Sequence, residues 1–305
     1  MEKTFSLRSS PPFRLDLTAW ALKRRESNII DNWDGQCYQR VMIILGKPIL
    51  VSVYQKNIKL PTLIVTTHRK VSALEVKDIK QNLKILLGLS YNAKNFYQLA
   101  ANDKYLKGLV KKLMGLKPPQ FLTLFESLCN AVACQQLSLN VGIELLNRLA
   151  RGYGKRLKYN KKNYYAFPSP LSISKCNPKD LQKLGFSLKK SNVLIQIANN
   201  LKTQEAVLQK KFIKISDKNI LTYLQSIKGI GRWSAEYVLL RGLGRLHIFP
   251  GDDVGAQKNL QKFLHLRKKM DYGKVEKVIK PWFPYAGLIY FHLLLNNINQ
   301  QKCLV

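Results

Sequence analysis

The chain has 305 residues, of which 51 are Lys or Arg and 18 are Asp or Glu, so its formal net charge is +33. Hydrophobic residues make up 46% and aromatic residues 10% of the sequence, which excludes a disordered basic tail and indicates two or three folded domains. So high a positive charge favours a polyanionic partner, first nucleic acid and second an anionic membrane surface. The alternative is a surface that merely reflects a lysine-rich genome.

Several other classes of protein are excluded. The longest apolar run, residues 41–53, is interrupted by Gly46, Lys47 and Pro48 and is too short to span a membrane. The first thirteen residues have no apolar core, so we expect no signal peptide. The five cysteines are scattered and form no metal-binding pattern, which predicts free thiols in a reducing cytoplasm and no iron–sulfur cluster. They are Cys37, Cys129, Cys134, Cys176 and Cys303.

Short runs rich in β-branched and aromatic residues predict strands in the first quarter of the chain. These runs are residues 5–8, 39–45, 49–55 and 62–67, and Gly46, Lys47 and Pro48 separate two of them as a turn would. Residues 18–25 could form one short helix. The sequence therefore predicts a small α/β N-terminal domain with an antiparallel sheet, over residues 1–90.

From residue 76 the apolar residues recur with the 3.6-residue period of a helix. Helices are predicted at 76–87, 93–113, 121–134, 138–151, 178–184, 188–201, 217–226, 231–242, 253–266, 272–278 and 284–297. The fold class is therefore α+β, with a larger all-helical region over residues 91–305.

Residues 224–242 predict two helices joined by a tight hairpin. Gly229 and Gly231 flank one apolar residue, which allows the helices to meet closely and leaves backbone N–H groups uncovered where a phosphate can bind. Lys228 and Arg232 add positive charge on either side. A plain turn between two helices is the alternative, because Gly-x-Gly alone is a weak signal.

The residues after the hairpin make the case for a site stronger. Trp233 and Tyr237 are four residues apart and share one face of the second helix. Asp252 and Asp253 then stand side by side in a very basic chain. One of them can cap the next helix, and Asp252 fits that structural role. Core packing is the alternative for the aromatic pair.

This segment resembles the helix-hairpin-helix, loop and aspartate signature of the DNA glycosylase superfamily, and in particular its 3-methyladenine glycosylase II branch. The resemblance extends to residues 121–138 (FLTLFESLCNAVACQQLS), 167–170 (FPSP) and 184–190 (LGFSLKK). Pro11, Pro12 and Phe13, with the apolar residues that follow, resemble the N-terminal domain of the alkylbase subfamily. The resemblance thus covers nearly the whole chain.

The resemblance implies roles for individual residues. Asp253 matches the catalytic aspartate, and the backbone carbonyls of Gln225, Ile227 and Ile230 match those that hold a structural monovalent cation against a DNA phosphate. The base pocket matches Trp233, Tyr237 and Trp282, while Ala21, with Trp20 beside it, falls at the register of an N-terminal pocket aromatic. Pro118 matches the apolar wedge that fills the gap left by a flipped base. No other cofactor is implied for catalysis.

The chemistry of the residues agrees with this resemblance. A glycosylase must extrude its target base, and a carboxylate near C1′ then stabilises the positive charge that develops on the sugar. Cationic alkylated purines stack well on Trp and Tyr. Bifunctional relatives carry a lysine where this chain has Trp233, which predicts a monofunctional enzyme without lyase activity. We expect a monomer that acts on damaged duplex DNA in the cytoplasm and does not bind membranes.

Two other functions remain open from the sequence. A glycosylase of the same fold could act on hypoxanthine, an etheno adduct or an oxidised base, and a non-catalytic module could use the hairpin only to bind DNA. Asp253 argues against the second. Gln135 and Gln136 are either a structural turn or a polar contact in the DNA groove, and the basic run at 155–162 is either a DNA contact or a solvated loop. Arg241 is expected to be a structural ion-pair partner.

Overall fold

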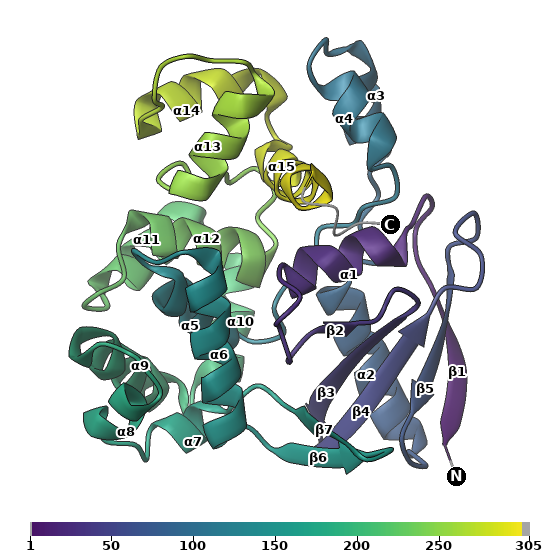
Figure 1. The fold of residues 1–305 in the computed structure, drawn as a ribbon, viewed down its shortest axis with the longest axis vertical. Helices are drawn as coiled ribbons and strands as arrows, with labels where there is room; N and C mark the ends of the chain where they lie inside the picture. The colour runs from purple at the N-terminus through teal and green to yellow at the C-terminus, as the bar shows by residue number, and fades with distance from the viewer. Residues whose placement is uncertain (1, 301–305) are drawn as a thin grey trace.

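The computed structural model describes residues 2–300, with a sheet in its N-terminal part and helices in the rest (Figure 1). The sheet has five antiparallel strands in the order β1-β5-β4-β3-β2. They are β1 (Lys3–Arg8), β2 (Asn32–Trp33), β3 (Cys37–Ile44), β4 (Lys47–Tyr54) and β5 (Thr62–Thr67). The predicted α+β class and antiparallel sheet are thus confirmed. Cys303, one of the predicted free thiols, lies outside the described residues.

Helix α2 (Ala73–Leu86) packs on one face of the sheet (Figure 1). Its residues Ile79, Leu83 and Leu86 are fully buried in the core beneath the strands, as their helical spacing requires. Ser72 begins the helix with a capping box, in which its hydroxyl accepts from the Glu75 N–H and the Glu75 carboxylate accepts from the Ser72 N–H. This domain is therefore a sheet with its own apolar core.

Helix α1 (Leu15–Lys23) lies between the sheet and the helices and is buried on both sides. One side packs in the core beneath the sheet and the other in a core built by later helices. The residues are Leu15, Ala19 and Leu22 on the first side, and Leu17, Trp20 and Ala21 on the second. The chain leaves α1 through Arg24 with a left-handed backbone (φ 60°), so this arginine is delivered to the junction of the two parts.

The helices gather around two apolar cores. The first core is formed mainly by α5 (Leu124–Cys134), α6 (Leu139–Tyr153), α7 (Pro170–Ile173), α8 (Pro178–Lys183), α9 (Leu188–Leu201), α10 (Glu205–Lys214), α11 (Asp217–Ser226) and α12 (Arg232–Leu243). The second is formed by α3 (Lys94–Asn102), α4 (Leu106–Lys112), α13 (Val254–Phe263), α14 (Tyr272–Ile279), a 3-10 turn (Lys280–Trp282) and α15 (Ala286–Gln300). The division at residue 90 stays a prediction.

The structure contains β2, α7 and α10, which the sequence did not predict, and two further segments have a different form from the one expected. The single helix expected at 93–113 is broken, because the Asp103 carboxylate accepts from the N–H groups of Tyr105 and Leu106 and so restarts the chain as α4. The basic run expected as a loop or DNA contact forms a hairpin of β6 (Arg156–Tyr159) and β7 (Lys162–Tyr165), which lies against β3 and β4.

No single described helix is long and apolar enough to cross a membrane. The segments Tyr272–Trp282 and Ala286–Ile298 pass that test only as a pair bent by 105°.

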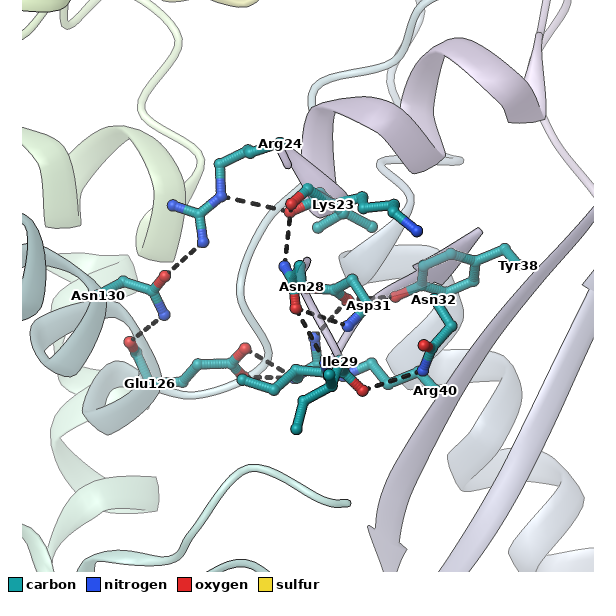
Figure 2. A network of polar contacts seen from close by, with 12 residues as sticks. Lys23, Arg24, Asn28, Ile29, Asp31, Asn32, Tyr38, Arg40, Glu126 and Asn130 are labelled. Atoms are coloured by element: carbon teal, nitrogen blue, oxygen red, sulfur yellow. Dashed lines mark hydrogen bonds and ion pairs between the residues drawn. The ribbon is translucent and has the colours of Figure 1, made fainter. Parts of the chain in front are cut away.

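A buried polar network joins the sheet to the helices (Figure 2). The Arg40 guanidinium on β3 donates to Asp31 and to both carboxylate oxygens of Glu126 on α5, each at 2.7 Å. The Asn130 side chain donates to the Glu126 carbonyl and accepts from Arg24 Nη2 at 2.6 Å. Burial raises the pKa of Glu126, which the charge of Arg40 partly offsets. The network therefore fixes Arg24 relative to α5.

Candidate functional site

The hairpin between α11 and α12 is as tight as its sequence predicts. Gly229 has a left-handed backbone (φ 90°), and a Cβ there would lie 2.5 Å from Val193 Cγ2. Gly231 precedes α12, and a Cβ there would meet nothing within 4 Å. The backbone at the start of α12 is thus open to solvent, with exposed Lys228 and Arg232 on either side. An N-terminal helix end with this exposure attracts anions.

Gln135 supports the hairpin from the end of α5. Its side-chain amide donates to the Gly229 carbonyl and to the Ser234 hydroxyl, both at 2.9 Å. The sequence left open whether Gln135 forms a structural turn or contacts DNA. Its contacts are those of a structural residue that holds the hairpin. Gln136 is exposed with a left-handed backbone (φ 55°), and it lines a groove of about 740 Å³ together with Gly229, Gly231 and Arg232.

The loop after α12 brings the two aspartates to this groove in different roles. Asp253, rather than Asp252, caps α13, since its Oδ1 accepts from the Ala256 N–H at 2.9 Å. Asp252 instead accepts from Arg232 Nε at 2.7 Å, so the expectation that it is the helix cap is wrong. The Asp253 Oδ2 accepts from the Tyr290 hydroxyl at 3.1 Å. Asp253 is therefore held by two elements.

Glu236 on α12 holds the loop that carries Asp252 and Asp253. Its carboxylate accepts from the Gly251 N–H at 3.2 Å and from the Tyr272 hydroxyl at 2.7 Å. Only 4% of Glu236 is exposed, and burial raises its pKa to about 7. Gln257 Nε2 donates to the Gly251 carbonyl at 2.7 Å, so the backbone N–H and the carbonyl of Gly251 are both held by side chains. The position of Asp252 and Asp253 thus depends on this buried acid.

A cavity of about 360 Å³ opens beside Asp253, between the two helical cores. Its walls come from α12, the turn between α5 and α6, the start of α13, one side of α15 and the end of α1. Trp233 and Tyr237 line it together, with ring centroids 5.6 Å apart and an interplanar angle of 33°. The volume is large enough to hold a purine base, and the paired rings offer an aromatic face for stacking.

Three residues expected at this site lie elsewhere. Trp282 is buried in the second helical core, where its Nε1 donates to Asp103 at 2.8 Å, and Trp20 is buried on α1 in the same core. Neither is among the residues that line the cavity. Pro118 is also buried, and a Cβ at Gly88 would lie 2.4 Å from its carbonyl oxygen, so it cannot reach DNA as a wedge. All three side chains are packed inside the protein.

The predicted cation ligands are backbone carbonyls at the end of α11 and in the turn that follows. The Ile227 carbonyl accepts from the Ile230 N–H at 2.9 Å, which leaves its second lone pair for another partner. Gln225 lies in the last turn of α11, where carbonyls lack partners within the helix and carry the negative end of its dipole. The chemistry of these atoms fits a cation, while the start of α12 fits an anion.

Several residues that line the cavity were not predicted from the sequence. Leu137, 44% exposed, lies at the mouth of both the cavity and the groove, and Tyr290 comes from α15. Arg24 arrives from α1 and donates to the Tyr237 hydroxyl at 3.0 Å. Arg241 is not the expected ion-pair partner, since no described carboxylate pairs with it; its guanidinium lies against the rings of Phe121 and Phe291.

The sequence model of the HhH-GPD superfamily of base excision DNA repair proteins matches residues 129–284, more than half of the chain. This chain belongs to that superfamily. The match runs from the middle of α5 to just past the 3-10 turn, and so includes the hairpin, the aspartate loop and the aromatic pair of this HhH-GPD protein.

This HhH-GPD protein is similar to several proteins described as 3-methyladenine DNA glycosylases. A DNA-3-methyladenine glycosylase of Bacillus subtilis is 31% identical over 198 residues, which are 65% of each chain, so the match covers just under two thirds of that relative. The structure of a 3-methyladenine DNA glycosylase from Archaeoglobus fulgidus superposes with a TM-score of 0.84 over 95% of this chain and 97% of that one, at 24% identity. A Schizosaccharomyces pombe 3-methyladenine DNA glycosylase, in complex with abasic DNA, has a TM-score of 0.56 and 25% identity, over 66% and 95% of the two chains.

Proposed function

We propose that this protein is a monofunctional DNA glycosylase that hydrolyses the N-glycosidic bond of alkylated purines in duplex DNA. The observation that carries the proposal is the position of Asp253, a fixed carboxylate in the lining of a cavity that is large enough for a purine and has an aromatic pair in its wall. The names of the relatives favour the same activity. Removal of the damaged base would leave an abasic site and begin base excision repair.

The reaction follows from this geometry. The hairpin would bind phosphates through the start of α12, and the target nucleotide would rotate out of the helix into the cavity. Leu137, exposed beside the cavity, is better placed than Pro118 to fill the gap that the base leaves. As the base departs, Asp253 would stabilise the positive charge on the sugar and direct a water molecule to C1′. The enzyme would act as a monomer on chromosomal DNA.

A monovalent cation could strengthen the grip on the phosphate. The carbonyls of Gln225, Ile227 and Ile230 would hold it at the negative end of α11. The ion would supply positive charge to the phosphate bound beside it and would take no part in bond cleavage. Exchange of potassium for a larger organic cation should weaken duplex binding without changing the rate on saturating DNA.

Release of free base from methylated duplex DNA tests the proposal, and borohydride trapping tests its mechanistic class. We expect free alkylated purine, an intact abasic strand and no covalent adduct, because Trp233 has no nucleophilic amine. Lys258 is the lysine that lines the cavity, so it is the amine that an adduct would implicate. A trapped adduct, or strand cleavage without alkali, would place the enzyme in the bifunctional class. DNA binding with no base release would favour a binding module.

A further inference from the structure

Tyr272, the first residue of α14, contacts three residues around the loop that carries Asp253. They are Glu236 and Arg232 on α12 and Gly251 in the loop itself. Tyr272 is half-buried and is among the lining residues of neither the groove nor the cavity. It can therefore act on a substrate only through the residues that it holds.

The hydroxyl of Tyr272 forms one end of a bridge between α14 and the loop. It donates to Glu236 Oε1 at 2.7 Å, and Glu236 Oε2 accepts from the Gly251 N–H at 3.2 Å. Burial and the Glu236 side chain raise the pKa of Tyr272, so the hydroxyl keeps the proton that it donates. The Glu236 side chain thus links the tyrosine to the backbone two residues before Asp253.

The ring of Tyr272 holds the same loop through separate contacts. The Arg232 guanidinium carbon lies 3.6 Å from the ring centroid, within the range of a cation–π contact. Arg232 Nε in turn donates to Asp252 Oδ2 at 2.7 Å. A Cβ at Gly251 would lie 2.7 and 2.8 Å from two ring carbons, so the ring packs directly on the loop backbone. Hydroxyl and ring together therefore join the start of α12 to the loop.

The two parts that Tyr272 joins have different tasks in the proposed reaction. A phosphate would bind at the start of α12, and Asp253 would act at C1′ of the target nucleotide. DNA held by the first is presented correctly to the second only if their separation is fixed. A misplacement of about 1 Å can cost roughly a hundredfold in rate.

We propose that Tyr272 is a positioning residue for base release. By clamping Arg232, Glu236 and Gly251 together, it sets the distance from the phosphate-binding end of α12 to the Asp253 carboxylate. This inference rests on the proposed glycosylase function and adds a residue to its machinery. Asp253 is also held by the Ala256 N–H and by the Tyr290 hydroxyl, so loss of the clamp loosens the carboxylate without releasing it.

Two substitutions of Tyr272 separate the ring from the hydroxyl. Tyr272→Leu removes both, whereas Tyr272→Phe keeps the ring on Arg232 and Gly251. For the full-length protein, we expect Tyr272→Leu to lower the rate of base release on saturating methylated duplex by about tenfold or more. Tyr272→Phe should lose only about threefold, in the range of one hydrogen bond. Affinity for undamaged duplex, measured by fluorescence anisotropy, should stay unchanged in both, because Tyr272 does not line the groove.

Tyr105→Leu is the matched control. This tyrosine also has a cation near its ring, since Lys104 Nζ lies 4.9 Å from the centroid, but it is absent from the lining of the groove and of the cavity. Its rate and affinity should equal those of the wild type. Thermal unfolding of every variant is measured in parallel, and if Tyr272→Leu does not fold, the rate of Tyr272→Phe decides.

The outcomes separate this inference from the proposed function. A rate that the Tyr272 variants leave unchanged would overturn the inference while the glycosylase function stands. A parallel loss of rate, affinity and unfolding temperature would also overturn it, because a purely structural residue gives that result. If the wild-type protein releases no base, the proposed function fails and the inference fails with it.

Discussion

Asp253 joins a structural and a chemical role in one side chain, and substitution by asparagine separates them. Asparagine caps helices as well as aspartate does, so α13 should keep its first turn, but the negative charge at the cavity is lost. We expect Asp253→Asn to reduce base release on saturating DNA by about 10²–10³. Thermal unfolding and duplex binding, measured in parallel, should stay close to wild type.

Asp252→Asn is the matched control for that experiment. It weakens a half-exposed ion pair with Arg232, an interaction worth roughly 0–1 kcal/mol, so base release should change little. Loss of turnover in Asp252→Asn, with activity retained in Asp253→Asn, would exchange the two assignments.

Glu236 should make the stability of the protein depend on pH. The pKa of this carboxyl is raised by burial from 4.5 to about 7 in the folded protein. Between these values the folded state holds a proton that the unfolded state releases, so the free energy of unfolding should fall as pH rises. Relative to Glu236→Gln, the wild type should lose on the order of 2–3 kcal/mol between pH 4.5 and 7. Urea unfolding of both proteins at pH 5 and pH 8 measures this; parallel changes would contradict it.

At the scale of elements, the two hairpin glycines should respond differently to valine. Gly231 has open space around its Cβ position, so Gly231→Val should fold normally but cover the N–H groups at the start of α12. We expect duplex binding about tenfold weaker, with an unchanged rate on saturating DNA. Gly229→Val meets Val193 and a left-handed backbone, which should lower the unfolding temperature as well. Equal thermal stability of the two variants would contradict this reading of the turn.

The order of the elements was largely predictable because their apolar periods are strong, as in α2, α9 and α11. The β6–β7 hairpin was missed because its turn uses Asn160 and Lys161 in left-handed conformations (φ 46° and 63°), without the glycine that usually marks such a turn. Helix α10 was missed for a different reason. It is rich in charged residues and buries only one side chain, Phe212, so its sequence shows no clear apolar period.

The candidate site was predictable where its residues are close in sequence. The hairpin, Trp233, Tyr237 and Asp253 all fall within thirty residues, and local spacing is enough to bring them together. Trp282 and Trp20 show the limit, since helical spacing does not tell a core aromatic from a cavity wall. Arg24 could not be found from the sequence, because only the packing of α1 between two cores brings it to Tyr237.

For the whole molecule, the net charge of +33 should dominate DNA binding. Each phosphate that a lysine or arginine neutralises releases a condensed counterion, so affinity falls with added salt. We expect a log–log slope of affinity against salt of magnitude about 5 or more, for six or more contacts, and little dependence on sequence. Fluorescence anisotropy with undamaged duplexes between 50 and 200 mM salt measures the slope. A flat dependence would contradict binding through phosphates.

The pairing of Arg40 with Glu126 limits how a gene for this protein can be trimmed or recombined. The arginine is encoded with the sheet and the glutamate with the helices, and each is about 2–3% exposed. A fragment that begins at residue 91 would lose Arg40 and Asp31 together, so Glu126 would be left without its counter-charge at a face that the sheet no longer covers. It would also lack Arg24, one wall of the cavity. The sheet domain thus contributes a side chain to the candidate site, and the two parts of the chain should be exchanged together.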